Sequence, residues 1–105
     1  MKRTVLTPAL SASALLLTMQ AVHAGPQAHV VCSYSHTLGD DAIMMFGMPN
    51  EAMLHDFFGN VHADAYSSRE SLRTQEKTTC DNKADSSAYW APSLKLPDGT
   101  VVKPA

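Results

Sequence analysis

The chain has 105 residues, with eight Lys and Arg against ten Asp and Glu, a net charge of −2 and 45% hydrophobic residues. This mildly acidic balance lacks the clustered basic surface that nucleic acids require, so we expect no nucleic-acid partner. A chain of this length buries only about 60% of its unfolded surface, so a stable fold is expected to need a covalent staple.

The first 24 residues are predicted to be a secretory signal peptide. Two basic residues open the chain, Val5 to Met19 is largely apolar, and Val22-His23-Ala24 is a small-x-small cleavage site. An uncleaved anchor is the alternative, but the apolar run is shorter than the roughly 20 residues of a membrane span and contains a proline. We therefore expect residues 25–105 to form one secreted or periplasmic domain with no membrane contact.

Two cysteines, Cys32 and Cys80, are the only ones in the chain. In an exported protein an even number of cysteines favours a disulfide. Two free thiols or two metal ligands are the alternatives, although a zinc site would need further Cys or His at close spacing. The sequence therefore predicts a disulfide-stapled domain.

The first half of this domain is predicted to be β-rich. Residues 29–36 alternate between two faces as a strand does, and Gly39-Asp40-Asp41 breaks that strand. The apolar run Ala42 to Phe46 is either a buried strand or an extended segment, and residues 47–50 form a turn. Together with the later strands, this pattern predicts a mainly β domain, β-sandwich-like, with one or two short helices; an α+β class is the alternative.

The most informative stretch is Leu54-His55-Asp56-Phe57-Phe58-Gly59-Asn60. Two large rings are expected to anchor it in the core, and Gly59-Asn60 to end it sharply. Residues 51–58 fit either a helix or a strand. On a strand, His55 and Phe57 would share one face and Asp56 and Phe58 the other.

Several polar residues in and after this stretch are candidates for a functional site. His55 and Asp56 could act as an acid–base pair, although a backbone-bonded His and a turn-capping Asp are the simpler interpretation. Asn60 is a candidate ligand-binding residue. His55, His62 and Asp64 are only weak candidates for metal ligands, because their spacing fits no known motif; no metal site is assigned and the cofactor stays unknown.

The second half is predicted to contain a short helix and a hairpin. Ser67-Ser68-Arg69-Glu70 is typical of a capping box that opens a helix ending near Thr74. Residues 93–103 alternate around Pro97-Asp98-Gly99, which is typical of a turn. Between them, Tyr89 and Trp90 are candidate ligand-binding residues, because an exposed ring can stack on a sugar; packing of both rings in the core is the alternative.

These motifs, taken together and in this order, resemble a family of secreted domains of unknown function, number nineteen ninety-six. The pieces that carry the resemblance are Cys32, Asp41-Ala42-Ile43, Gly47, Leu54 to Asn60, Thr79-Cys80 and Ser87 to Leu94. They cover nearly all of the predicted mature chain. Some members of the family accompany carbohydrate-binding modules, so the resemblance implies a link to polysaccharide.

The chain departs from the family pattern at three places. Ala42 and Phe46 stand where the family has proline, and Met53-Leu54-His55 replaces its usual His-x-His. The missing histidine weakens any metal or acid–base pair carried over, since a thioether is a soft ligand. Family domains also continue beyond the Ser-Ala-Tyr-Trp block, which implies that this chain is an N-terminal part of a longer domain.

Three functions remain open from the sequence. The first is a polysaccharide or cell-wall binding domain that uses the Tyr89-Trp90 pair. The second is an extracellular carbohydrate-active enzyme that uses His55 and Asp56. The third is a secreted metal-binding protein.

Overall fold

The computed structural model describes residues 2–5 and 28–105. Most of the predicted signal peptide, residues 6–24, lies outside the described residues. Among the residues that are described, no helix has the length and apolar character needed to cross a membrane.

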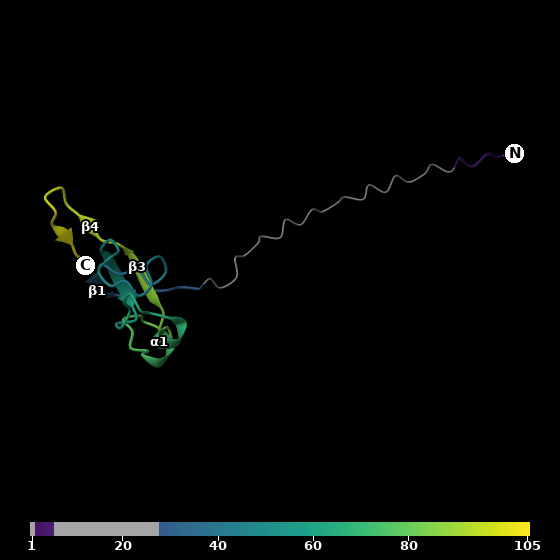
Figure 1. Cartoon of the computed structure of the whole chain (residues 1–105). Coiled ribbons are helices and arrows are strands. Elements are labelled where there is room, and N and C mark those ends of the chain that lie inside the picture. Colours follow the sequence, from purple (N-terminus) through teal and green to yellow (C-terminus); the bar gives the residue numbers. More distant parts are fainter. Residues whose placement is uncertain (1, 6–27) are drawn as a thin grey trace.

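The described part of the chain contains five strands and one helix, joined by loops (Figure 1). Their bounds are β1 Tyr34–Leu38, β2 His55–Gly59, α1 Arg69–Thr74, β3 Ala88–Pro92, β4 Leu94–Lys95 and β5 Val101–Val102. The first sheet has the antiparallel order β1-β2-β3, and β4 and β5 form a separate antiparallel hairpin. The predicted mainly β class with one short helix and one disulfide is thereby confirmed.

The central strand β2 decides between the two alternatives for residues 51–58. Neighbouring aromatic rings favour a strand, and β2 is hydrogen-bonded on both sides, to β1 and to β3. It ends at Gly59, whose φ of 86° is a left-handed conformation that favours glycine. A Cβ at Gly59 would also collide with the carbonyl oxygen of Ser87. The strand alternative is therefore correct for His55 to Phe58, whereas residues 51–54 belong to neither a helix nor a strand.

One face of the sheet carries the core. Phe57 is 1% exposed, and its ring lies between His36 on β1, stacked at 4.9 Å, and Trp90 on β3, tilted at 5.7 Å. The buried Ala63 and Ala65 come from the segment after β2, and His36 Nε2 donates to the Ala63 carbonyl over 2.7 Å. In the described part of the chain, this face is thus covered by the segment after β2, while β4 and β5 form a separate two-stranded sheet.

The other face of the sheet is more polar. Phe58 meets Tyr34 edge-on with ring centroids 6.3 Å apart, and Phe58 is only half-buried. The expectation that both phenylalanines anchor the core therefore holds fully for Phe57 alone. Asp56, on the same face, accepts hydrogen bonds from Thr37 Oγ1 at 2.7 Å and Ser93 Oγ at 2.9 Å. These bonds tie its carboxylate to β1 and to the residue that directly follows β3.

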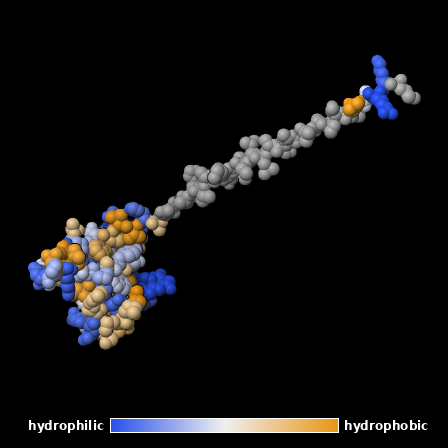
Figure 2. All heavy atoms as spheres, turned by 90° about the horizontal axis from the view of Figure 1, so that it is seen from above, coloured by the Kyte–Doolittle hydropathy of each residue, from blue (hydrophilic) through white to orange (hydrophobic). Residues whose placement is uncertain are grey.

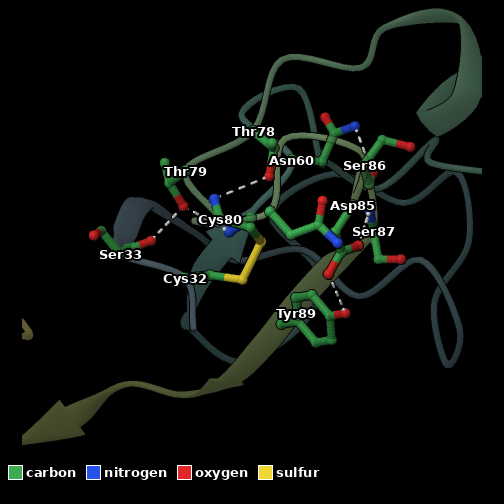
Figure 3. Close-up of a disulfide and its surroundings, with 12 residues drawn as sticks. Cys32, Ser33, Asn60, Thr78, Thr79, Cys80, Asp85, Ser86, Ser87 and Tyr89 are labelled. Carbon is green, nitrogen blue, oxygen red and sulfur yellow. Dashed lines mark hydrogen bonds between the residues drawn. A yellow bond between two sulfur atoms is a disulfide. The ribbon is translucent and has the colours of Figure 1, made fainter. Parts of the chain in front are cut away.

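The predicted disulfide joins Cys32 to Cys80 (Figure 3). Cys80 is 1% exposed, and the two cysteines also form an isolated antiparallel bridge. Beside them, Thr79 Oγ1 donates to the Ser33 carbonyl at 2.6 Å and accepts from the Gly59 amide at 2.9 Å. The staple therefore holds the segment before β1 against the end of β2.

Two predicted elements differ from the structure in their extent. The strand expected over residues 29–36 is displaced to β1, with only a bridge at Cys32 before it. The run Ala42 to Phe46 is neither buried nor a strand, because Asp41 Oδ1 accepts from the amides of Ile43 and Met44, both at 2.9 Å, and folds it into turns. The hairpin over residues 93–103 is confirmed, and Gly99 takes the left-handed position with φ 89°.

Helix α1 begins one residue later than the predicted capping box implies. The N-cap is Ser68, whose Oγ accepts from the Ser71 amide at 3.1 Å, while Ser71 Oγ accepts from the Ser68 amide at 2.9 Å. Serine therefore takes the N3 place that the sequence assigned to Glu70. The shift arises because Ser67 Oγ is already engaged with the amide of Asp64 at 2.9 Å.

We expect Ser68→Ala to lower the free energy of unfolding by about 1 kcal/mol, because it leaves the Ser71 amide in the first turn of α1 without its acceptor. Urea denaturation followed by circular dichroism measures this. Ser68→Asp, which keeps a side-chain acceptor at the N-cap, is the control and should unfold close to the parent midpoint. Equal losses in the two variants would contradict the assigned cap.

Candidate functional site

A shallow pocket of about 430 Å³ opens beside Trp90. It combines one edge of the three-stranded sheet with the loop that follows β1. Its lining residues are Asp41, Ile43, Met44, Ala88, Tyr89 and Trp90. Tyr89 and Trp90, which the sequence proposed for ligand binding, are both among its lining residues, although their side chains leave β3 on opposite faces.

The loop that carries Asp41 is held in place by the preceding residue. Asp40 is 3% exposed, and its Oδ1 and Oδ2 accept from the backbone amides of Asn50 at 2.8 Å and Ala65 at 3.0 Å. Its carbonyl accepts from His55 Nδ1 at 3.1 Å. The carboxylate of Asp40 therefore ties the loop to the segment after β2, and its carbonyl ties the loop to β2 itself, which gives Asp41 a fixed position.

Asp41 presents an ionised carboxylate to the pocket. The backbone amide of Met44 holds its pKa below the ordinary value, and the Ile43 amide, His55 and the Trp90 side chain act in the same direction. These effects outweigh the opposing effect of burial. The carboxylate is therefore expected to stay charged as the pH falls towards 3.8, its ordinary pKa.

Two exposed apolar residues form the outer side of the pocket. Ile43 is 77% exposed and Met44 is 80% exposed, on the turn that Asp41 holds. Figure 2 shows apolar residues in several patches on the face that it presents, between polar ones. Exposed side chains of this kind can cover an apolar ligand surface, as Met does on adaptable binding surfaces.

The two aromatic residues of β3 have different roles. Trp90 is half-buried and backed by the ring of Phe57, so its orientation is fixed by the core. Tyr89 points to the opposite face, where its hydroxyl donates to Asp85 Oδ2 at 2.8 Å (Figure 3). This hydrogen bond raises the pKa of Tyr89, while the Ser87 amide and then Tyr89 lower the pKa of Asp85. Of the two rings, Trp90 is therefore the stronger candidate for contact with a ligand in the pocket.

His55 and Asp56 do not converge on one site. They are neighbours on β2 and therefore point to opposite faces of the sheet. His55 lies on the face of Phe57, where it contributes to the lowered pKa of Asp41. Asp56 accepts hydrogen bonds from Thr37 and Ser93 on the other face. The structure does not bring these two candidates together as an acid–base pair.

The side chain of Asn60 is buried and hydrogen-bonded within the protein. It is 0% exposed, and the two hydrogens of its Nδ2 are shared among the carbonyls of Gln75, Ser86 and, at the longer distance of 3.3 Å, Leu72, while its Oδ1 accepts from the His62 amide. Because all its polar atoms are engaged within the protein, we assign it to the scaffold.

The weak metal candidates are dispersed among the described residues. His62 is exposed, and Asp64 Oδ1 accepts from the Tyr66 amide at 2.9 Å. The cluster of potential ligands that does occur in the described part is Cys32, Cys80 and Asp85. Its two sulfurs are bonded to each other, so they are not thiolate ligands in the oxidised protein.

The sequence did not indicate the loop side of the pocket. It offered Asp41 as a strand-breaking residue and, with Asp56 and Asp64, as one of three candidate carboxyl groups of an enzyme. It left Ala42 to Phe46, which includes Ile43 and Met44, as either a buried strand or an extended segment. The Asp-x-Ile-Met pattern, in which one carboxylate can accept from the two following amides, was the available local signal.

Comparison with known proteins gives a family but no characterised relative. No curated protein and no solved structure matches the chain. The model of a family described as "Domain of unknown function (DUF1996)" matches residues 41–104, which is more than half of the chain and includes every residue that lines the Trp90 pocket. The chain therefore belongs to the DUF1996 family of domains of unknown function.

Proposed function

We propose that this protein is a secreted domain that binds polysaccharide through the Trp90 pocket. The observation that carries the proposal is a half-buried indole, fixed by Phe57, that lies beside the ionised carboxylate of Asp41. Sugars present an apolar ring face that can stack on such a ring and hydroxyl groups that can donate to such a carboxylate. The exposed Ile43 and Met44 add apolar contact area at the rim.

Export supports this proposal. The Cys32–Cys80 disulfide is of the kind that forms and persists in oxidising compartments. The positive start, apolar stretch and small-x-small site of residues 1–24 have the pattern of a cleaved signal peptide. A secreted or periplasmic location would place the pocket where polysaccharides are found.

Binding has better support than catalysis. Glycosidases generally use two carboxyl groups that flank the bond to be cleaved. Asp41 lies in the pocket, but Asp56 belongs to the opposite face of the sheet. The second carboxyl group that an enzyme would need is therefore not among the lining residues of this pocket.

We expect Trp90→Ala to reduce retention on insoluble polysaccharide at least about tenfold, because the stacking surface is lost. Pull-down assays on cellulose, chitin and β-glucan, with bound and free protein quantified, measure this. Trp90→Phe keeps a ring against Phe57 and should retain part of the binding. Tyr66→Ala removes another aromatic side chain, 58% exposed and outside the pocket, and should bind like the parent protein.

The same assay contains the outcomes that would overturn the proposal. Retention of Trp90→Ala equal to that of the parent protein would exclude the Trp90 pocket as the binding site. Failure of the parent protein to bind any member of the panel would exclude the proposed ligand class. Far-ultraviolet circular dichroism of each variant shows whether a loss of binding reflects loss of the fold.

A further inference from the structure

A second pocket, of about 360 Å³, lies between α1 and the residues that lead into β3. It shares no lining residue with the Trp90 pocket. Its lining residues are Arg69, Leu72, Arg73, Ser86 and Ser87. The chemistry of this set is cationic and hydrogen-bonding, whereas the Trp90 pocket is aromatic, apolar and acidic.

Two arginines dominate this second pocket. Arg69 and Arg73 are four residues apart on α1, so their side chains lie on the same face of the helix, and both are exposed. Two like charges at this spacing weaken a helix, and an anion bound between them would remove that repulsion. The whole chain has a net charge of −2, so attraction of an anion has to come from this local pair.

The walls of the pocket are held together by the buried Asn60. Its Nδ2 donates to the carbonyl of Leu72 at 3.3 Å on the α1 side and to that of Ser86 at 2.9 Å on the β3 side. Its backbone amide donates to the Ser87 carbonyl over 3.0 Å. Figure 3 shows Asn60 with Ser86 and Ser87 beside the disulfide. One fully buried residue thus fixes both walls, and a preformed pocket lowers the entropy lost on binding.

We propose that the pocket between Arg69 and Arg73 binds an oxyanion group. A planar guanidinium matches the two oxygens of a carboxylate, sulfate or phosphate with two parallel N–H donors. Ser86 and Ser87 add polar groups on the opposite wall. The group is either free in solution as an inorganic ion or carried by a larger acidic ligand such as a uronic-acid sugar.

The test is a two-dimensional ¹H–¹⁵N NMR titration of the exported protein with inorganic phosphate, inorganic sulfate and glucuronate in separate arms. We expect saturable shifts at Arg69, Arg73, Ser86 and Ser87 in at least one arm. Shifts with phosphate or sulfate would assign a tetrahedral anion, and shifts with glucuronate alone would assign an acidic sugar.

Substitutions test whether these shifts arise from an anion bound by Arg69 and Arg73. Arg73→Gln is expected to weaken binding about tenfold or more, because a charge-assisted bidentate contact is lost. Arg73→Lys keeps the charge but loses the two-pronged geometry, and should bind with intermediate affinity. Lys95→Gln removes the same charge from the β4–β5 hairpin and should change the affinity by less than about twofold.

Two results would overturn this inference. One is the absence of saturable shifts in all three arms, and the other is equal weakening by Arg73→Gln and Lys95→Gln. The unchanged positions of other amide signals show that each variant is folded. Trp90→Ala should leave oxyanion binding intact, so failure here is distinguishable from failure of the polysaccharide proposal.

Discussion

Phe57→Ala is expected to lower the free energy of unfolding by about 3–5 kcal/mol, the usual effect of removing a buried phenylalanine. Phe57 is 1% exposed and is the largest buried side chain of the described core. Its ring also connects the three strands of the sheet, since it packs on His36 of β1 and Trp90 of β3. A domain of this size is marginally stable, so the loss removes much of its total stability.

Urea denaturation followed by tryptophan fluorescence measures this effect directly, because Trp90 is the chain's single tryptophan and lies against Phe57. Phe46→Ala is the matched control: the substitution is identical, but Phe46 is 59% exposed. The control should cost less than about 1 kcal/mol. Equal destabilisation by the two variants would mean that Phe57 is not the centre of the core.

Removal of the disulfide is expected to cost about 2–5 kcal/mol. Cys32 and Cys80 are 48 residues apart, so the bond closes a long loop and restricts the unfolded chain strongly. It also secures the segment before β1, which otherwise depends on hydrogen bonds such as that from Thr79 to Ser33. Few buried apolar residues could compensate for the loss of the disulfide. Among the described residues, the buried apolar core consists of Cys80 itself and of Phe57, Ala63 and Ala65.

The measurement compares the parent protein with the double variant Cys32→Ser/Cys80→Ser by thermal unfolding, each with and without dithiothreitol. We expect the reductant to lower the Tm of the parent protein towards that of the double variant and to leave the double variant unchanged. A parent Tm that is insensitive to the reductant, with both thiols shown by mass spectrometry to be reduced, would contradict a stabilising role for this bond.

Local features of the fold could be predicted from the sequence because each depends on residues close together in the chain. Pro97-Asp98-Gly99 specified the turn of the hairpin through its own backbone preferences. A serine-rich segment before residue 70 specified the start of α1 to within one residue. Cys32 and Cys80 were far apart, but as the only two cysteines they had a single pairing.

Which residues share a site was decided by the tertiary structure. The sequence could not choose between helix and strand for residues 51–58, and that choice separates His55 from Asp56 by placing them on opposite faces. It also could not bring Asp41 to Trp90, since their proximity depends on a loop fixed by the buried carboxylate of Asp40. Periodicity and turn chemistry describe residues that are close together in the chain. The position of the site residues depends instead on the register of three strands and on the path of one long loop, which bring distant residues together.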